Sequence, residues 1–294
     1  MGREGSTLSD RFPLGFCGGT LVASKYIITA AHCMKGMTAD QMAVRIGDHE
    51  LSTDTQPLTL PPKTVNVKTI TDHPDYNQNI VDGYDISILE LEEELDLDVY
   101  TPACLEKNMD DSLFSGPGNW TGTVAGWGLL EEARWLWPWP TPPNKTSVPH
   151  EVDLPIMPAA DCKWSHRCWP FWPFCTSVPS IICAAYPEGG KDTCQVQHIV
   201  ILLLRMGHQS IQKYKLPCFL YLVHDLPTYC QGDSGGPLTY KLGDQHILIG
   251  DVSYGDGCGK EGKYGVYGRI SFYRTWIEAK MSSPKFCGGT ANVA

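Results

Sequence analysis

A serine enclosed by glycines is the residue of this sequence best suited to nucleophilic chemistry. Residues 230 to 238 are Cys-Gln-Gly-Asp-Ser-Gly-Gly-Pro-Leu, which places Ser234 in a glycine-rich turn. Glycine permits tight or left-handed backbone conformations and lets a substrate carbonyl come close to main-chain N–H groups. Ser234 is therefore the candidate nucleophile of an acyl transfer, although glycine-rich turns with one serine are also common in ordinary loops.

Two other residues are of the types that could activate this serine. His32 follows an apolar run rich in β-branched residues, and Asp85 opens a second run that is mostly apolar. Taken singly, His32 could be a structural histidine, and Asp85 could be a turn residue at the start of a strand. Together, an acid carried into the core could accept a hydrogen bond from the imidazole and fix its tautomer, which would prepare the ring to take a proton from a serine.

The elements that would have to position these residues are short strands. Runs rich in Val, Ile and Thr alternate with turns that contain Gly, Pro and Asp, a pattern typical of an all-β protein. The expected strands cover residues 42–46, 64–70, 86–91, 121–125, 237–240 and 246–253. Residues 273–281 are the best candidate for a helix, with Trp276 and Ile277 on its inner face. This pattern fits two β-barrels that meet near residues 106–118.

With their flanking residues, and in the chain order His, Asp, Ser, these three sites closely resemble the trypsin/chymotrypsin family of serine endopeptidases. The resemblance extends from about Phe16 to Met281. Its motifs are Cys-Gly-Gly-Thr-Leu, Thr-Ala-Ala-His-Cys, Asp-Ile-Ser-Ile-Leu, Ala-Gly-Trp-Gly, the segment 182–192, the serine motif, Ser-Tyr-Gly and Gly-Val-Tyr. It implies one peptidase domain over residues 1–281, with two packed antiparallel β-barrels at about 16–106 and 119–281 and a C-terminal helix, followed by a tail at 282–294.

By this resemblance the three sites form a catalytic triad that hydrolyses peptide bonds through an acyl-enzyme. Ser234 would attack the scissile carbonyl, and His32 would take its proton and pass it to the leaving amine. Asp85 would orient His32 and stabilise its charged form. The backbone N–H groups of Gly232 and Ser234 would form the oxyanion hole, where the loss of one donor costs about 100- to 1000-fold in turnover.

The same resemblance implies a specificity pocket. Asp192 matches the acid at the floor of the pocket in trypsin-like members, and Ser253, Gly255 and Gly265 match its walls. A buried carboxylate without a cationic partner is costly, and a substrate Arg or Lys would supply the missing charge. We therefore expect cleavage after Arg or Lys. The alternative is that Asp192 is a surface acid in the turn Glu-Gly-Gly-Lys-Asp.

The active-site motif is interrupted in this chain. The family places its pocket acid six residues before the nucleophile, whereas Asp192 lies 42 residues before Ser234. Removal of residues 196–231 would restore Lys-Asp-Thr-Cys-Gln-Gly-Asp-Ser-Gly-Gly-Pro-Leu. Every Val codon begins with GT and Gln can be encoded by CAG, so these 36 residues could be a translated retained intron. The alternative is a true insertion loop, which would leave from the pocket wall and return to the oxyanion strand.

The beginning of the chain also departs from the family pattern. Family members are cleaved to expose an Ile-Val-Gly-Gly-type N-terminus, whose amine pairs with the acid before the nucleophile, here Asp233. Residues 1–14 contain no such tetrapeptide. We therefore expect a chain truncated at its start, with Asp233 and the oxyanion loop arranged as in an unactivated precursor.

There are two alternatives to an active peptidase. The first, which these departures favour, is a catalytically inactive protease-like protein that presents its loops to a binding partner. The second, an esterase or lipase with the same triad, is disfavoured. Such enzymes carry their serine in a Gly-x-Ser-x-Gly elbow and have the order Ser, acid, His.

Twelve cysteines predict disulfide bonds formed in an oxidising compartment. The resemblance pairs Cys17 with Cys33, Cys162 with Cys183, and Cys258 with either Cys194 or Cys230. Cys104 matches a position that often links the catalytic domain to a propeptide, and no partner is assigned to Cys168, Cys175, Cys218 or Cys287. We expect a secreted protein, although no secretory signal is present in this chain.

Charge and hydropathy limit the partners. The chain has 294 residues and a formal net charge of −10, which argues against nucleic acid as a partner. The apolar run at residues 199–204 is far shorter than the ~20 residues that span a membrane. We expect a monomer that acts on protein or peptide substrates, is bound by protein protease inhibitors, and needs no metal or cofactor for catalysis. A calcium site at Asp48, Glu50 and Asp54 is a hypothesis from the resemblance, because some relatives bind calcium in this loop.

Overall fold

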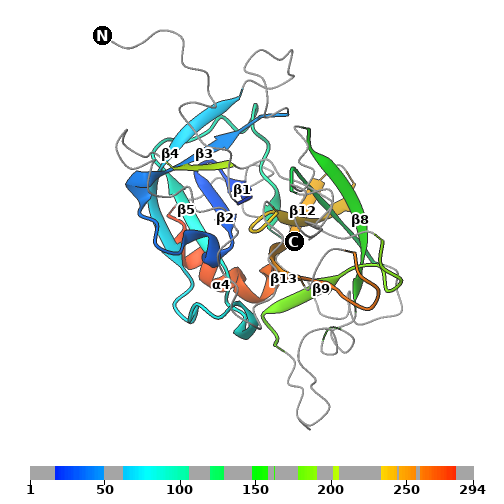
Figure 1. Ribbon diagram of the computed structural model, residues 1–294. Helices are drawn as coiled ribbons and strands as arrows, with labels where there is room; N and C mark the ends of the chain where they lie inside the picture. Colours follow the sequence, from blue (N-terminus) through cyan, green and yellow to red (C-terminus); the bar gives the residue numbers. More distant parts are fainter. Residues whose placement is uncertain are drawn as a thin grey trace, which may run out of the picture.

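The computed structural model describes residues 17–49, 62–105, 120–128, 148–157, 162, 178–190, 201–204, 233–243, 245–255 and 259–282, and for 201–204 the backbone alone. Strands dominate this part of the chain. They form two sheets that lie against each other, with the helix α4 (Ile270–Lys280) beside their junction (Figure 1). Among these residues, no helix is both long and apolar enough to cross a membrane.

The first sheet is formed mainly by the N-terminal part of the chain. Its strand order is β1-β2-β5-β4-β3-β10, and all neighbouring strands are antiparallel. The strands are β1 (Thr20–Ala23), β2 (Tyr26–Thr29), β3 (Met42–Ile46), β4 (Lys63–Asp72), β5 (Ser87–Leu91) and β10 (Ile201–Leu204). β10 belongs to the interrupting segment 196–231, and its backbone pairs with β3.

Strand β2 illustrates why these short apolar strands are buried on both faces. Its four residues, Tyr-Ile-Ile-Thr, are all buried. Successive side chains of a strand point to opposite faces. Ile27 therefore packs into the core of the first sheet, while Tyr26 and Ile28 pack on the other side, against residues of α4 and the second sheet. Full burial of an apolar side chain of this size contributes about 1.5–3 kcal/mol.

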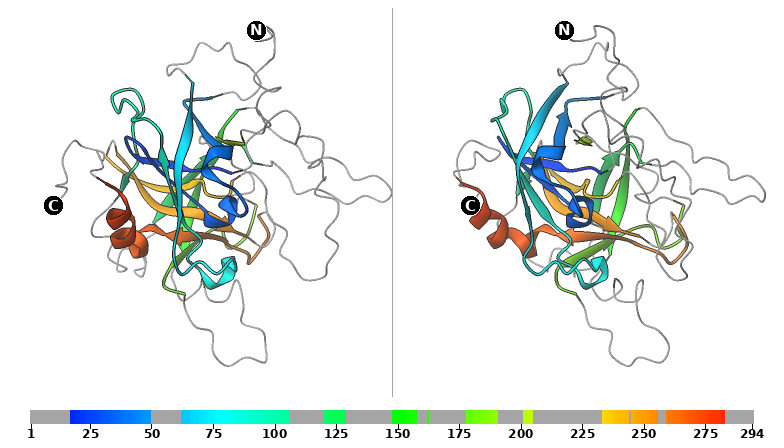
Figure 2. Two further views of the ribbon diagram at one scale, coloured as in Figure 1. Left: turned by 90° about the vertical axis from the view of Figure 1, so that its left-hand side faces the viewer. Right: turned by 60° about the vertical axis from the view of Figure 1, so that its left-hand side comes forward.

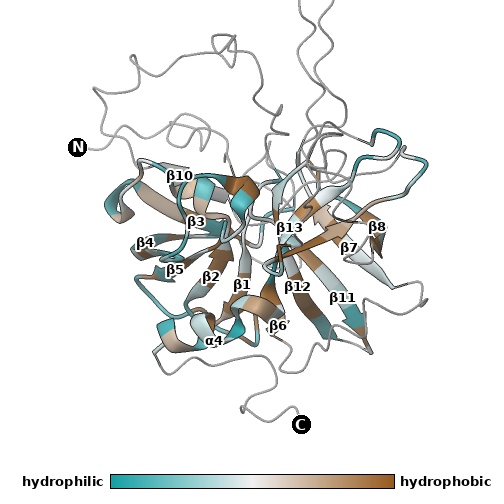
Figure 3. Cartoon of the chain, turned by 90° about the horizontal axis from the view of Figure 1, so that it is seen from below, coloured by the Kyte–Doolittle hydropathy of each residue, from teal (hydrophilic) through white to brown (hydrophobic). Residues whose placement is uncertain are grey.

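The second sheet closes on itself. Its strands follow the order β11-β7-β8-β9-β13-β12, and an additional pairing of β11 with β12 joins the two ends into a barrel. These strands are β7 (Thr121–Gly126), β8 (His150–Met157), β9 (Ile181–Ala184), β11 (Pro237–Leu242), β12 (Gln245–Tyr254) and β13 (Gly265–Arg269). The short strand β6 (Cys104–Leu105) adds to β12 in a parallel orientation (Figure 3).

Helix α4 covers the junction between the two sheets (Figure 2). Its buried residues Ile270, Tyr273 and Ile277 are spaced three and four positions apart, so they lie on one face of the helix. In the same core cluster they meet Ile28 of the first sheet and Leu248 of the second. The helix thus packs against both sheets at once.

The prediction of an all-β protein with two packed barrels and a C-terminal helix is confirmed. The strand expected at 42–46 is β3, and the other expected strands end within two residues of the observed ones. The helix begins at Ile270, earlier than expected, because the chain passes directly from β13 into it. Ile277 is buried as expected, whereas Trp276 is only partly buried. The boundary expected near residues 106–118 lies outside the described residues.

Replacement of Ile277 tests the packing of α4. Its side chain is 0 % exposed, so Ile277→Ala should lower the free energy of unfolding by about 2–5 kcal/mol, as cavity-forming substitutions do. Thr275→Ala, at an exposed site of the same helix, should change it by less than about 0.5 kcal/mol. Urea unfolding followed by circular dichroism measures both changes. Equal losses in the two variants would contradict this packing.

Candidate active site

His32 lies in a short 3-10 turn that directly follows β2. A disulfide bond joins the next residue, Cys33, to Cys17 just before β1, with the two Cα atoms 6.2 Å apart. The predicted pairing of these cysteines is therefore confirmed. Because the bond anchors the neighbour of His32 to a second segment of the first sheet, the histidine has little freedom to move with its turn.

Asp85 precedes β5 and follows a residue with an unusual backbone conformation. Tyr84 has a φ of 62°, in the left-handed region that bulky side chains rarely adopt. The hydroxyl oxygen of Tyr273 on α4 accepts the N–H of Tyr84 at 2.9 Å, and the carbonyl oxygen of Tyr84 accepts the N–H of Ile86 at 2.9 Å. The Tyr84 ring also stacks on His73, with the ring centroids 5.0 Å apart. These contacts hold the backbone that carries Asp85.

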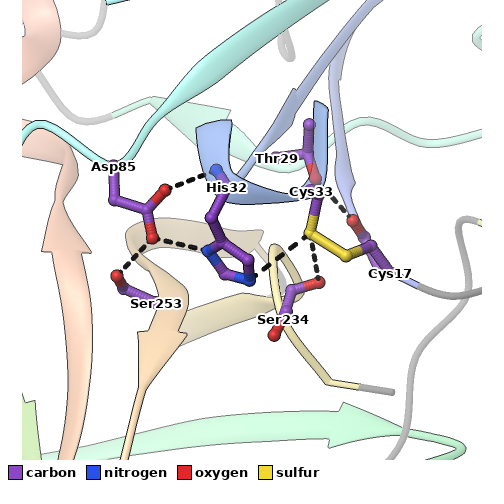
Figure 4. The surroundings of a disulfide bond; sticks show 8 residues. Cys17, Thr29, His32, Cys33, Asp85, Ser234 and Ser253 are labelled. Atoms are coloured by element: carbon purple, nitrogen blue, oxygen red, sulfur yellow. Dashed lines mark hydrogen bonds and ion pairs between the residues drawn. A yellow bond between two sulfur atoms is a disulfide. The ribbon is translucent and has the colours of Figure 1, made fainter. Parts of the chain in front are cut away.

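Asp85 and His32 form a contact at two points (Figure 4). Oδ1 of Asp85 accepts the backbone N–H of His32 at 2.7 Å, and Oδ2 lies 2.7 Å from Nδ1 of the ring. Ser253 of β12 donates its hydroxyl to Oδ2 as well. Because the carboxylate faces Nδ1, we assign the ring proton to that nitrogen, which leaves Nε2 as the basic atom.

Ser234 lies beside the His32 ring, on the side away from Asp85 (Figure 4). The carbonyl oxygen of Ser234 accepts the N–H of Gly18 at 2.7 Å. The same oxygen lies 3.8 Å from Sγ of Cys33, and this sulfur lies 3.7 Å from Nε2 of His32. The structure thus brings together Asp85, His32 and the turn of Ser234, which are far apart in the sequence.

The glycine after the serine makes this turn possible. Gly235 has a φ of 78° and donates its N–H to the carbonyl oxygen of Val252 on β12 at 2.7 Å. A Cβ atom at this position would lie 2.2 Å from Oγ1 of Thr29 and 2.7 Å from the carbonyl oxygen of Gly18. A side chain here would therefore push the serine turn away from the first sheet.

Asp233, the acid before the nucleophile, is buried and bound to the backbone. Its Oδ1 accepts the N–H of Gly128 at 3.1 Å. A Cβ atom at Gly128 would lie 2.4 Å from Oδ2, so the last glycine of the Gly-Trp-Gly motif is what lets the carboxylate approach. The N–H of Gly236 donates to the carbonyl oxygen of Asp233 at 2.9 Å and closes the turn. Gly232, the other predicted donor of the oxyanion hole, lies outside the described residues.

Ser253, which the sequence assigned to a pocket wall, has a second contact. Its buried hydroxyl donates to Asp85, 168 residues away in the chain. Nothing in the local sequence could indicate this bond, because it depends on the packing of β12 against the first sheet. The place of Ser253 in the pocket wall stays a prediction. Of the other predicted pocket residues, Gly255 directly follows β12 and Gly265 begins β13. Asp192 lies outside the described residues.

The second predicted disulfide bond is also present, between Cys162 and Cys183, with Cα atoms 5.6 Å apart. Cys104 is disulfide-bonded too. Because the other described cysteines pair with one another, its partner lies outside the described residues. Cys194, Cys230 and Cys258 themselves lie outside the described residues, so their pairing stays a prediction.

One group among the described residues has the spacing of a metal site: Cys17, His32 and Cys33, whose ligand atoms lie within 4.8 Å of one another. The two sulfur atoms form a disulfide bond, however, and metal ions bind thiolates. This group therefore does not suit a metal ion while the bond is intact.

The predicted calcium loop begins with an acid that already has a partner. Both carboxylate oxygens of Asp48 accept hydrogen bonds from the guanidinium of Arg45, one of them at 2.9 Å. Glu50 and Asp54 lie outside the described residues. Calcium binding by this loop stays a prediction, and it would require Asp48 to share its oxygens with Arg45.

Comparison with known proteins agrees with this geometry. A family model described as Trypsin matches residues 6–196 and 215–277. Coagulation factor IX of Cavia porcellus is 29% identical over 266 residues, which cover 89% of this chain and 71% of that protein. Coagulation factor IX of Oryctolagus cuniculus is 28% identical over 263 residues, which cover 89% of this chain and 74% of that protein. The residues between the two parts of the family match, 197–214, fall within the interrupting segment.

Replacement of Tyr273 tests whether its hydroxyl helps to hold the backbone that carries Asp85. Tyr273→Phe leaves the N–H of Tyr84 without its acceptor, which should lower the free energy of unfolding by about 1–3 kcal/mol. The NMR signal of the Nδ1 proton of His32 should also broaden or move, because the residue before Asp85 loses a restraint. Tyr240→Phe on β11 is the matched control and should leave that signal in place. An unchanged signal in Tyr273→Phe would contradict this role.

Proposed function

This chain belongs to the trypsin family, and on that premise we propose that it is a serine endopeptidase that cleaves after Arg or Lys through an acyl-enzyme. The observation that carries the proposal is the contact of Asp85 with His32 beside the turn of Ser234. A buried carboxylate fixes the ring through Nδ1 at 2.7 Å and leaves Nε2 on the side of the serine. These are the parts that acyl transfer requires.

In the proposed reaction, Ser234 supplies its hydroxyl oxygen as the nucleophile. The bond from Oγ to the substrate carbon forms while the proton passes to Nε2 of His32, and the carbonyl becomes an oxyanion. The C–N bond then breaks, and His32 returns the proton to the leaving amine. Water attacks the acyl-enzyme with His32 again as the base, which releases the acid and restores Ser234.

Asp85 stabilises the positive charge that His32 carries between these proton transfers. Its support comes from three donors: the backbone N–H and the ring of His32, and the hydroxyl of Ser253. Because the acid is held by several bonds, it keeps the ring oriented through both steps, and misplacement of a reacting group by ~1 Å can cost about 100-fold in rate.

The oxyanion hole is assigned to the backbone N–H groups of Gly232 and Ser234. What supports this assignment is the way the turn is anchored. The carboxylate of Asp233 binds the N–H of Gly128, and the N–H of Gly235 binds β12. A turn fixed on both sides of the serine can keep its N–H donors aimed at one point.

The preference for Arg or Lys is assigned to Asp192, with Ser253, Gly255 and Gly265 as the proposed walls of the pocket. Small wall residues leave room for a long side chain, and a guanidinium can bind a carboxylate through two parallel hydrogen bonds. The hydroxyl of Ser253 is bound to Asp85, so Ser253 would contribute its backbone to the wall of this pocket.

The proposed setting is extracellular. The disulfide bonds of Cys17 with Cys33 and of Cys162 with Cys183 fit an oxidising compartment. We propose a secreted monomer that acts on protein or peptide substrates and is regulated by protein inhibitors. Nucleic acid and membranes are not proposed as partners, and no cofactor is needed for the reaction described above.

An inactive protease-like binding protein is the second candidate. The observation that favours it is the segment between Asp192 and Ser234, part of which forms β10 at the edge of the first sheet. Such a segment separates the pocket acid from the oxyanion turn along the chain. The two candidates therefore differ in whether residues 196–231 are present in the native protein.

Peptide mass spectrometry of the native protein separates these forms. Digestion after Lys and Arg should release a peptide that starts at Asp192. If the segment is absent, as the retained-intron hypothesis predicts, the peptide is Asp-Thr-Cys-Gln-Gly-Asp-Ser-Gly-Gly-Pro-Leu-Thr-Tyr-Lys. If it is present, the peptide is Asp-Thr-Cys-Gln-Val-Gln-His-Ile-Val-Ile-Leu-Leu-Leu-Arg, which would contradict the hypothesis and favour the binding protein.

Peptide cleavage tests the activity itself. The purified protein should hydrolyse a fluorogenic peptide with Arg at the scissile position, and faster than the matched peptide with Leu. Ser234→Ala and His32→Ala should each reduce kcat/KM by at least about 10⁴-fold. His150→Ala, at an exposed site of β8, should leave it unchanged. A folded wild-type protein no more active than Ser234→Ala would count against the peptidase. Equal rates on the Arg and Leu peptides would count against the role of Asp192.

A further inference from the structure

A second carboxyl group lies close to the catalytic pair. Asp251 on β12 is 0 % exposed and comes two residues before Ser253. Ser253 of the same strand contacts Asp85, and the charge of Asp85 acts on Asp251, so the two carboxyl groups lie in one region of the molecule. The mechanism proposed above does not use this acid.

The two acids differ in their hydrogen bonds. Asp85 accepts from the backbone and the ring of His32 and from Ser253. Both oxygens of Asp251 are buried without a hydrogen-bond partner among the described residues. A charged carboxylate in such surroundings would cost several kcal/mol, because it has lost its water and gained only a weak contact with its own backbone N–H.

The residues in register with this side chain leave room for it but carry no charge, and the nearest charged residue of β13 is Arg269, in register with Gly250. Gly268 of β13 is in register with Asp251, and a Cβ atom there would lie 2.3 Å from its Oδ1. On the other side, Pro237 of β11 is in register with it. Two titratable groups in the described part of the chain interact with Asp251 through their charge. One is Asp85, from the loop before β5, and the other is Tyr273, from α4.

Two carboxyl groups in one dry region do not both ionise, and the donors determine which one keeps the charge. Burial, with a further contribution from the charge of Asp85, raises the pKa of Asp251 well above its usual range. Among the described residues, Asp251 also lacks the hydrogen-bond donors that Asp85 has.

We propose that Asp251 carries its proton in the folded protein, so that of these two carboxyl groups Asp85 alone is charged behind His32. For its consequence this inference rests on the proposed function, in which His32 must be neutral to act as a base. A second negative charge near Asp85 would favour the protonated ring, which cannot accept the proton of Ser234. A neutral Asp251 leaves His32 available.

The first test is the pH dependence of unfolding, measured on the full chain with Ser234→Ala to prevent self-cleavage. An unfolded Asp loses its proton near pH ~3.9, whereas the folded Asp251 keeps it. Above that pH the folded state binds one proton more, so stability falls as pH rises towards the folded pKa of Asp251. Relative to Asp251→Asn, which has no such proton, the unfolding constant should grow by up to about tenfold per pH unit from about pH 4 upwards. A ratio that does not change with pH would overturn the proposal.

The second test measures charge at the catalytic pair. The NMR signals of the His32 ring give the pH at which the ring takes up its proton. In the Ser234→Ala protein this pH should be the same with and without the substitution Asp251→Asn, because a neutral group is then replaced by another neutral group. A lower pH in the variant would mean that a charge had been removed, and it would refute the proposal.

Two further variants make these tests decisive. Asp251→Val, which is apolar, replaces Asp251→Asn if the amide prevents folding. Glu151→Gln removes an exposed acid from β8 and should give an unfolding ratio independent of pH. Neither measurement uses enzymatic activity, so an inactive wild-type protein would count against the peptidase and leave the result on Asp251 intact.

Discussion

The buried negative charge of Asp85 is the constraint on which the arrangement of the two sheets depends. A carboxylate that is 1 % exposed is tolerated only where hydrogen-bond donors replace its lost water. His32 supplies two of these donors from the first sheet, and Ser253 supplies one from β12 of the second. The bonds that orient the histidine therefore also join the sheets. The apolar cluster around α4 excludes water from this junction. Hydrogen bonds are stronger where water is excluded, so the bonds to Asp85 are strengthened.

The backbone of Tyr84, directly before Asp85, is a second place where the packing of the fold supports the candidate site. Tyr84 is held in a left-handed conformation, which costs about 1–3 kcal/mol for a residue of this size. The cost is offset by Tyr273 on α4, whose hydroxyl binds the N–H of Tyr84, and by the stacking on His73. A helix at the C-terminal end of the domain thus stabilises the strained turn that positions Asp85. The packing of α4 and the orientation of Asp85 therefore cannot vary independently.

The sequence predicts those features that are written into local patterns. Short β-branched runs indicate the strands, and the glycines around Ser234 indicate a tight turn, because each follows from the preferences of neighbouring residues. The pairing of Cys17 with Cys33 followed from family resemblance. Features that arise when distant segments meet were missed. The bond of Ser253 to Asp85, the parallel pairing of β6 with β12, and the burial of Asp251 opposite Gly268 all depend on how the sheets close. An acid in a strand gives no local sign that its water will be lost.

The interrupting segment and the catalytic pair are separable in physical terms. β10 pairs with β3, whereas the residues that hold His32 and Asp85 lie on the turn after β2, in the loop before β5 and on β12. Without β10, the first sheet would expose β3 as an edge, but no hydrogen bond of Asp85 would be lost. Asp192 and Gly232, in contrast, directly flank the segment. Its presence therefore bears on the proposed pocket and the proposed oxyanion hole, whereas the contact of Asp85 with His32 does not depend on it.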